Sequence, residues 1–179
     1  MNIVLTGSNG FLGSHLVRHC STMYTFSLLC RNPNGHNAFD IQCEQQVNTA
    51  LKKSDVLIHC AARAHVLHDK SSDPWSDFVS SNLDLTVMLA QKAIKAGVKR
   101  FIFISSLKVN GEGTASTPYK NDDAIMPFDY YAKSKAQAEI KLKDLCANSN
   151  MEFVIIRAPL VYGEGVKANF MALLSLVNK

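Results

Sequence analysis

The sequence predicts one α/β domain with a doubly wound parallel sheet, and three observations support this fold class. Short, nearly continuous apolar runs alternate with longer amphipathic segments, as expected for strands that helices cover on both faces. A glycine-rich turn directly follows the first apolar run. The 179 residues, of which 47% are hydrophobic, can fill one core. Right-handed β-α-β connections between these segments give a parallel sheet flanked by helices.

The strands are expected in the short apolar runs, at residues 2–6, 25–30, 56–60, 100–105 and 153–157. The helices are expected in the amphipathic segments, at residues 11–20, 44–51, 77–96 and 130–147. The third of these helices ends at Gly97 with lysines in its last turn, which is typical of a helix C-terminus. Residues 107–129 are too many for a plain connector and follow the carboxyl end of a central strand, so we expect them to border the ligand site.

The glycine-rich turn holds Gly7, Gly10 and Gly13, between the first predicted strand and the first predicted helix. Taken alone, three glycines at this spacing also occur in ordinary tight turns. Their position favours phosphate binding, because bare backbone can approach a pyrophosphate closely and the helix N-terminus supplies N–H groups. The expected ligand is a dinucleotide.

Charge and cysteine patterns narrow the class of partner and the compartment. The net charge of +4 comes from scattered lysines and arginines without a basic block, so nucleic acid is not expected as a partner. The five cysteines form no C-x-x-C pair, which fits reduced thiols and a cytoplasmic location. The first apolar run is too short for a signal peptide and no stretch reaches bilayer length, so we expect a soluble protein without a membrane span.

Two groups of potential metal ligands are interpreted without a metal. His15 and His19 are four residues apart on the first predicted helix, and Cys60, His65 and His68 form a looser group. Neither group has a further carboxylate or thiolate that would complete a metal site. No metal is therefore expected.

Tyr131 and Lys135 lie four positions apart in the fourth predicted helix, so their side chains share one face. An ammonium close to a phenol favours the phenolate and lowers the tyrosine pKa from about 10, which suits acid–base catalysis. Ser106, just after a predicted strand, is placed to hold a substrate oxygen beside that phenol. A tyrosine and a lysine at this spacing also occur as an exposed pair without a catalytic role, so the pattern gains its meaning from the glycine turn and the serine.

The glycine turn, the strand-end serine and the tyrosine–lysine helix occur in this order in the extended short-chain dehydrogenase/reductase family. The chain resembles the NAD-dependent nucleotide-sugar epimerases and dehydratases of that family over its full length. Further matching segments are residues 40–41, 57–62, 81–83, 101–106, 131–135 and 157–163. The resemblance implies a Rossmann-type fold, an NAD(P) cofactor and a UDP-sugar substrate.

The resemblance also implies catalytic roles for individual residues. Tyr131 would be the acid–base catalyst, and Lys135 would hold the nicotinamide ribose and lower the tyrosine pKa. Ser106 would hydrogen-bond the reacting sugar oxygen, with Ser105 the less favoured candidate. Tyr130 stands where many relatives have proline, but only Tyr131 has a lysine four residues on.

Cofactor and substrate contacts follow from the same resemblance. The expected cofactor contacts are Gly7, Asn9, Gly10, Phe11, Leu12, Gly13, Arg31, Asp40, Ile41, Ala61, Ala62, Asn82, Tyr131, Lys135 and Pro159. Arg31 stands where an NAD-specific fold places an acid, so NADP(H) is somewhat favoured, while the nearby Asp40 keeps NAD open. Lys108 and Asn169 match sugar-nucleotide contacts, with a solvated loop lysine and a helix-capping asparagine as the alternatives.

Residues 105–112 and 157–170 look most like a bacterial branch of the family that makes surface polysaccharides such as O-antigen. Members of that branch are 4-epimerases or 4-keto reductases. The reductases form UDP-N-acetyl-quinovosamine or UDP-N-acetyl-fucosamine from a 4-keto-6-deoxy sugar. Hydride transfer at sugar C4 is common to both activities, and NADP(H) would favour the reductase.

The sequence departs from the family in its length. Relatives continue well beyond residue 179 and there supply a last strand and most of a small substrate-binding lobe, so we expect this lobe to be largely missing. Both a piece of a longer enzyme and a naturally short protein fit the sequence. In either case we expect cofactor binding with little turnover from these residues alone.

A second class of function stays open, namely a non-catalytic dinucleotide-binding module such as a redox sensor. Such a module needs the glycine turn but not the acid–base residues, so the presence of Ser106, Tyr131 and Lys135 favours an enzyme. The resemblance also implies a homodimer, because relatives pair through the helices expected here at residues 77–96 and 130–147.

Overall fold

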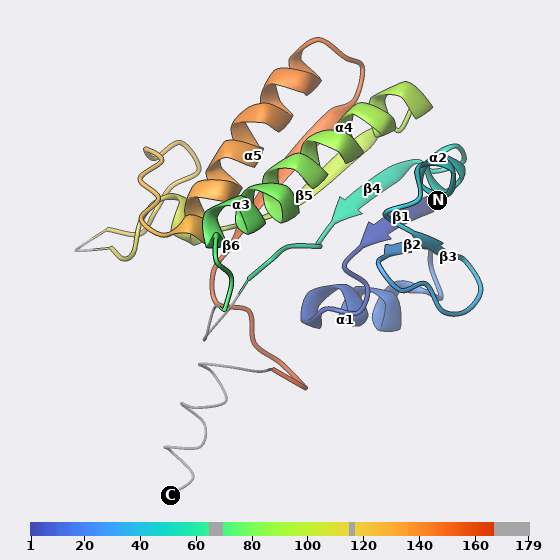
Figure 1. The fold of residues 1–179 in the computed structure, drawn as a ribbon, viewed down its shortest axis with the longest axis horizontal. Coiled ribbons are helices and arrows are strands. Elements are labelled where there is room, and N and C mark those ends of the chain that lie inside the picture. Colours follow the sequence, from blue (N-terminus) through green and yellow to red (C-terminus); the bar gives the residue numbers. More distant parts are fainter. Residues whose placement is uncertain (65–69, 115–116, 167–179) are drawn as a thin grey trace, which may run out of the picture.

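The computed structural model describes residues 1–64, 70–114 and 117–166 of the chain. Its centre is a six-stranded parallel sheet in the order β3-β2-β1-β4-β5-β6 (Figure 1). The strands are β1 (Asn2–Thr6), β2 (Thr25–Cys30), β3 (Ala38–Asp40), β4 (Val56–His59), β5 (Arg100–Ser106) and β6 (Glu152–Ala158). The helices are α1 (Phe11–Cys20), α2 (Glu44–Leu51), α3 (Pro74–Phe78), α4 (Leu85–Ala96) and α5 (Tyr130–Ala147). A π-helical segment (Val79–Asp84) joins α3 to α4, and a 3-10 turn (Leu107–Val109) follows β5.

The helices divide unequally between the two faces of the sheet (Figure 1). On one face α2, α4 and α5 bury the larger core, and on the other α1 covers a smaller one. The alternation of β5 shows how the sequence defines these faces. Phe101 and Phe103 are completely buried in the larger core, whereas Ile102 and Ile104, at the alternate positions, are only half-buried. The predicted fold class is confirmed.

The third helix begins earlier than the sequence pattern indicates. It begins at Pro74 rather than at residue 77, because Asp73 accepts a hydrogen bond from the Ser76 N–H (3.1 Å) and proline fits the first helical position. The π-helical segment that follows widens one turn and carries Asn82, whose side chain is completely buried. In the described part of the chain, no helix has both the length and the apolar character needed to cross a membrane.

Four of the six strands differ from the predictions. β6 begins at Glu152 and ends at Ala158, one residue beyond the expected range at each end. β3 has only three residues, too few for a periodic pattern, and the sequence does not predict it. β4 ends at His59, one residue before the expected end, and β5 continues to Ser106, one residue beyond it. These last two strands end beside each other at the carboxyl edge of the sheet, where the candidate site lies.

β6 forms one edge of the sheet in the described part of the chain. Three of its apolar side chains keep much of their surface in contact with solvent, with exposures of 38% for Phe153, 40% for Val154 and 45% for Ile156. At its start, Arg100 of the neighbouring β5 donates to Glu152 from Nε at 2.9 Å. Part of the apolar surface of this edge strand therefore stays in contact with solvent in the described part of the chain.

Candidate functional site

The glycine turn between β1 and α1 is so tight that two of its glycines leave no room for a side chain. Gly7 adopts a φ of +73°, and a Cβ atom there would lie 2.7 Å from the backbone nitrogen of Ala61. A Cβ atom on Gly13 would lie 2.2 Å from the carbonyl oxygen of Gly7. The Gly10 N–H donates to that same oxygen at 2.9 Å and closes the turn. Bare backbone thus meets the N-terminus of α1, the arrangement that binds a pyrophosphate.

The turn lies where the strand order of the sheet reverses, between the neighbouring strands β1 and β4. Ligands of open parallel sheets bind at such a reversal. The predicted contacts Asn9, Gly10, Phe11 and Leu12 stand at the start of α1, and among the described residues no side chain caps this helix. The tight turn and the uncapped helix start together fit the pyrophosphate of a dinucleotide.

The two candidates for ribose recognition stand at the same edge of the sheet. Arg31 follows β2 directly, Asp40 ends β3, and these strands pair with Cys30 opposite Asp40. The Arg31 side chain is exposed, and Asp40 Oδ1 accepts the Gln42 N–H at 2.9 Å. The side chain of Ile41 is buried. An acidic and a basic group are both within the region where an adenosine ribose would lie on this fold.

The segment after β4 is held against the glycine turn by side-chain hydrogen bonds. The Ala61 N–H donates to the Thr6 hydroxyl at 3.1 Å. Asn82 Oδ1 accepts the Arg63 N–H at 2.8 Å, and Asn82 Nδ2 donates to the Arg63 carbonyl at 3.1 Å. Asn82 therefore braces the segment that carries Ala61 and Ala62.

Ser106 and Tyr131 meet where β5 ends and α5 begins, and the Ser106 hydroxyl acts on the phenol to lower its pKa. Ser105 points to the opposite side of its strand, where it is buried and donates to Glu139 Oε1 at 2.5 Å. The two consecutive serines therefore have different environments. Of the two serines, Ser106 is the one whose hydroxyl lies next to the Tyr131 phenol.

The side chain of Lys135 is buried and contacts two residues of β5. Its Nζ donates to the Ile104 carbonyl at 2.8 Å and lies 4.4 Å from the centre of the Phe103 ring. Burial lowers the pKa of Lys135 to about 8, while Cys60 and Glu139 act in the opposite direction. The Lys135 ammonium is thus charged at neutral pH, although its burial makes the charged form less favourable than it is in water.

The expectation that Lys135 lowers the Tyr131 pKa is wrong for this structure. The pKa of Tyr131 is raised, because burial and the nearby Asp129 carboxylate outweigh the hydrogen bond with Ser106 and the charge of Lys108. The Phe78 ring, with its centre 6.5 Å from that of Tyr131, contributes to this burial. The phenol is therefore protonated at neutral pH in this structure.

Lys108, a predicted substrate contact, lies close to Tyr131 and forms ion pairs with two acidic side chains. Its Nζ donates to Asp129 Oδ2 at 2.6 Å and is 3.5 Å from Glu112 Oε1. The hydrogen bond to Asp129 raises the pKa of Lys108. Because Asp129 also caps α5 by accepting the Ala132 N–H at 2.7 Å, Lys108 is tied to the start of the helix that carries Tyr131.

Pro159 directly follows β6 on a segment that returns toward α1. A Cβ atom on Gly163 in this segment would lie 3.7 Å from the Phe11 ring, and Glu164 pairs with Arg18 at 2.9 Å. The segment that carries Pro159 thus approaches the helix of the glycine turn. Asn169, the second predicted substrate contact, lies outside the described residues.

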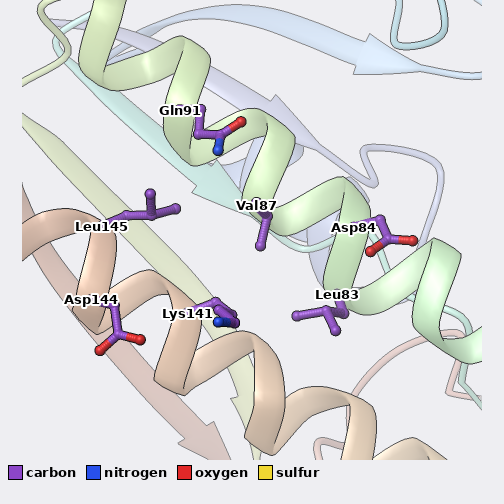
Figure 2. A pocket seen from close by; sticks show the side chains of 7 residues that line it. All are labelled: Leu83, Asp84, Val87, Gln91, Lys141, Asp144 and Leu145. Carbon is purple, nitrogen blue, oxygen red and sulfur yellow. The ribbon is translucent and has the colours of Figure 1, made fainter.

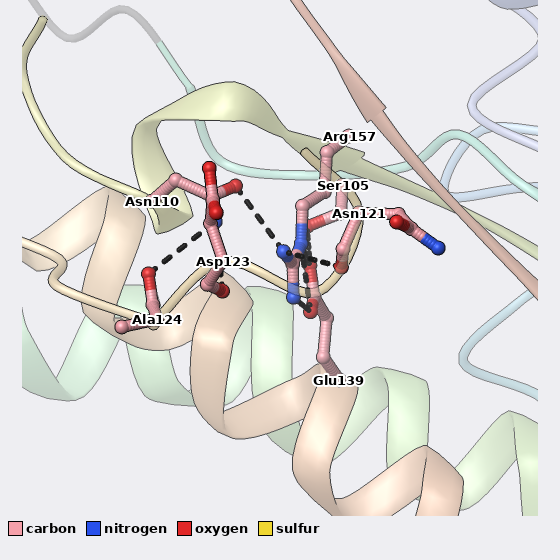
Figure 3. Close-up of polar contacts among 7 residues, drawn as sticks. All are labelled: Ser105, Asn110, Asn121, Asp123, Ala124, Glu139 and Arg157. Atoms are coloured by element: carbon pink, nitrogen blue, oxygen red, sulfur yellow. Dashed lines mark hydrogen bonds and ion pairs between the residues drawn. The ribbon is translucent and has the colours of Figure 1, made fainter. Parts of the chain in front are cut away.

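A buried ion pair, which sequence reasoning missed, joins α5 to β5 and β6 (Figure 3). Glu139 is completely buried and accepts Arg157 Nη2 at 2.8 Å as well as the Ser105 hydroxyl. Arg157 Nη1 donates to Asn110 Oδ1 at 3.2 Å, and Asn110 Nδ2 donates to the Asp123 carbonyl at 3.2 Å. The network fixes the long connection after β5 beside Tyr131. Its only sequence signal is a charged residue in an otherwise apolar strand and another on a buried helix face.

Within the described ranges, no three His, Cys, Asp or Glu side chains are placed to hold a metal ion. His15 Nδ1 lies 2.8 Å from the Phe11 carbonyl, and its ring stacks on His19. His65 and His68 lie outside the described residues. Burial raises the pKa of Cys60 to about 11, so its thiol stays protonated at neutral pH.

A hollow of about 460 Å³ lies between α4 and α5, further along α5 than the catalytic candidates (Figure 2). Leu83, Val87 and Leu145 give it apolar walls, and Asp84, Gln91, Lys141 and Asp144 give it a polar border. The hollow shares no residue with the glycine turn or with the Ser106–Tyr131 pair. It belongs to a helix surface and not to the candidate site.

Known proteins similar to the chain include three nucleotide-sugar 4-epimerases. It is 44% identical to a UDP-glucose 4-epimerase of Vibrio cholerae over 99% of its own length and 57% of that relative. The crystal structure of UDP-glucose 4-epimerase from Thermotoga maritima with UDP-glucose matches 91% of the chain and 57% of that protein, with 26% identity and a TM-score of 0.79. A UDP-N-acetylglucosamine 4-epimerase from Methanobrevibacter ruminantium, in complex with UDP-N-acetylmuramic acid, matches 87% of the chain and 54% of that protein, with 28% identity and a TM-score of 0.74.

The chain thus spans somewhat more than half the length of these relatives. The sequence model of one family, the NAD dependent epimerase/dehydratase family, matches residues 3–176. That range includes the glycine turn, Ser106, Tyr131 and Lys135. The chain belongs to the NAD dependent epimerase/dehydratase family.

Proposed function

We propose that this chain is the cofactor-binding and acid–base part of an enzyme that modifies a UDP-sugar by hydride transfer at C4. The observation that carries the proposal is the pair of neighbouring hydroxyls of Ser106 and Tyr131, which stands at the same edge of the sheet as the glycine turn. The names of the relatives support a nucleotide-sugar substrate and favour 4-epimerisation over 4-keto reduction. The acid–base residues distinguish this function from that of a non-catalytic dinucleotide module.

The residues present suit the roles that such a reaction requires. Bound NAD(P) supplies the acceptor and donor of the C4 hydride. Tyr131 would take up the proton of the sugar 4-hydroxyl in its phenolate form and return it from the phenol, and Ser106 would hold that oxygen by a hydrogen bond. Lys135 uses one N–H for the Ile104 carbonyl and keeps two further donors, which we assign to the nicotinamide ribose.

The preference for NAD or NADP depends on Arg31 and Asp40, at the carboxyl ends of β2 and β3. A carboxylate at this edge favours the free ribose of NAD, and a guanidinium favours the 2′-phosphate of NADP. The family name supports NAD, whereas the exposed Arg31 directly after β2 supports NADP(H) and with it the 4-keto reductase. The 4-keto reductase is therefore the second candidate function.

The first test is calorimetric titration of the purified chain with NADH and NADPH separately. We expect binding of at least one, abolished by Gly13→Ala because a Cβ atom there meets the Gly7 carbonyl. Gly113→Ala is the matched control, since nothing lies within 4 Å of its Cβ position. Arg31→Asp should weaken NADPH binding selectively if the reductase assignment is right. A folded wild-type chain that binds neither dinucleotide would contradict the proposal.

Turnover is the second test. The relatives are almost twice as long as the part that the chain matches, so we expect these residues to bind cofactor while converting a UDP-sugar only slowly. Formation of the C4 epimer from UDP-glucose, followed by chromatography with added NAD, measures this. Rapid conversion by the 179 residues would show that they suffice for substrate recognition.

We also propose a homodimer that pairs through α4 and α5, in a reducing cytoplasm. The apolar walls of the hollow between these helices support such a contact (Figure 2). The cysteines, all without disulfide partners in the described residues, support the compartment. Val87→Glu should then shift the mass measured by analytical ultracentrifugation toward the monomer.

A further inference from the structure

A chain of buried hydrogen bonds, here called the polar path, begins beside the glycine turn and has no role in the proposed chemistry. Its centre is His59, completely buried between Thr6 of β1 and Thr86 of α4. The ring Nδ1 lies 2.6 Å from Thr6 Oγ1, and Nε2 lies 2.9 Å from Thr86 Oγ1. The Phe103 ring stacks on the imidazole with a centre-to-centre distance of 5.7 Å. Both nitrogens of a buried histidine are therefore used.

The backbone carbonyl of Asn82 fixes the direction of the hydrogen bonds around the neutral His59 ring. The Asn82 carbonyl only accepts, so the Thr86 hydroxyl donates to it at 2.6 Å, and the Thr86 oxygen accepts from His59 Nε2–H. A neutral ring with its proton on Nε2 has an acceptor at Nδ1, so the Thr6 hydroxyl donates to Nδ1, while its oxygen accepts the Ala61 N–H at 3.1 Å. His59 is therefore the neutral tautomer with its proton on Nε2.

The path continues from Asn82 to the helix that carries Tyr131. Asn82 Nδ2 donates to Ser134 Oγ at 2.9 Å, and the Ser134 hydroxyl donates to the Tyr131 carbonyl at 2.8 Å. Burial, and to a smaller extent the charge of Lys135, lowers the pKa of His59 to about 3. The ring thus stays neutral, and the direction of the path is stable at neutral pH.

We propose that His59 is a positioning residue for the dinucleotide site, acting through Thr6. With its proton on Nε2, His59 orients the Thr6 hydroxyl so that the Thr6 oxygen receives the Ala61 N–H. That bond sets the spacing between the glycine turn and the segment after β4, which is the spacing that leaves no room for a Cβ atom on Gly7. The role in binding rests on the proposed function, whereas the tautomer does not.

The tautomer is tested first, by nitrogen-15 NMR of the labelled chain without ligand. We expect the His59 signals of a protonated Nε2 and an unprotonated Nδ1. Thr86→Val keeps the shape of the side chain but removes the acceptor of the Nε2–H, so a mixture of tautomers should appear. Thr86→Ser keeps the hydroxyl and should keep the single tautomer. A wild-type ring protonated on Nδ1, or on both nitrogens, overturns the proposal.

Dinucleotide affinity is tested next with the same variants. Thr86→Val should weaken binding about tenfold, the effect of losing one buried hydrogen bond, and Thr86→Ser should restore it. Leu89→Ala is the control for general loss of packing, because Leu89 is completely buried on the same helix and makes no polar contact in the path. Equal weakening by Thr86→Val and Leu89→Ala overturns the positioning role. If wild-type protein binds no dinucleotide, the proposed function fails with that role, and the tautomer still decides whether the path exists.

Discussion

At the scale of single residues, Tyr131 carries the proposed proton transfer, and Tyr130 is its matched control. Tyr131→Phe removes the hydroxyl that Ser106 acts on, so we expect turnover to fall by about 10²- to 10⁴-fold. Tyr130 is half-exposed and packs its ring against Trp75, so Tyr130→Phe should leave turnover unchanged. Single-turnover absorbance of the bound dinucleotide measures both variants. If Tyr130→Phe lost more turnover than Tyr131→Phe, the proton transfer would belong to Tyr130.

His59 predicts a pH dependence of folding stability. Its pKa is about 3 in the folded chain and 6.5 in the unfolded one, so between these values the unfolded state binds more protons. The stabilisation is complete above pH 6.5 and is lost as the pH falls toward 3. The slope from this residue is at most about 1.4 kcal/mol per pH unit.

Urea unfolding at several pH values below neutrality measures that slope. His59→Asn has no titrating ring, so its stability should fall less steeply with acid than that of the wild type. The difference between the two slopes isolates His59 from the carboxylates, which titrate in both proteins. Parallel slopes would mean that the His59 pKa is the same in the folded and the unfolded chain.

At the scale of elements, the Glu139–Arg157 pair holds α5 against β5 and β6. Glu139→Gln leaves the largely buried guanidinium without a countercharge, and we expect the free energy of unfolding to fall by about 3–5 kcal/mol. Glu112→Gln is the control, because Glu112 lies in an exposed ion pair and its loss should cost about 0–1 kcal/mol. Urea unfolding at neutral pH compares them, and similar losses would show that the buried pair contributes no more than a surface one.

The elements that could be predicted are those whose own residues determine them. The segment from β1 to α1 followed from an apolar run, three glycines and a helical pattern, all within residues 2–20. β3 could not be predicted, because its three residues form a strand only by pairing with β2. The early start of the third helix depends on the cap at Asp73, which a hydrophobic pattern does not register.

The candidate site divides in the same way. The glycine turn, Ser106 and the Tyr131–Lys135 spacing are local patterns and were visible in the sequence. The raised pKa of Tyr131 was not, because it depends on burial by groups from other elements, such as Phe78. His59 and Thr86 lie 27 residues apart, and only the fold brings their polar atoms together.

At the scale of the whole molecule, the sheet separates two cores of unequal size. Leu142→Ala removes a nearly completely buried side chain from the larger core, and we expect it to cost about 2–5 kcal/mol. Leu16→Ala, in the partly buried layer beneath α1, should cost clearly less, since less apolar surface returns to water. Chemical denaturation of both variants measures the difference. Equal losses of unfolding free energy would mean that α1 buries the apolar side chains on its side of the sheet as completely as α4 and α5 do on theirs.

In the part of the chain that the structure describes, the edge of β6 is exposed, and this has a consequence for how the chain behaves among its own copies. An edge strand offers a row of backbone donors and acceptors, and here Phe153, Val154 and Ile156 lie beside that row. A sheet that ends in this way can be extended by any strand of matching pattern, so aggregation grows with concentration. A lysine in place of Ile156 would act as a gatekeeper against such growth. Any polypeptide that properly covers this edge removes the hazard, whether it belongs to the same chain or to a second one.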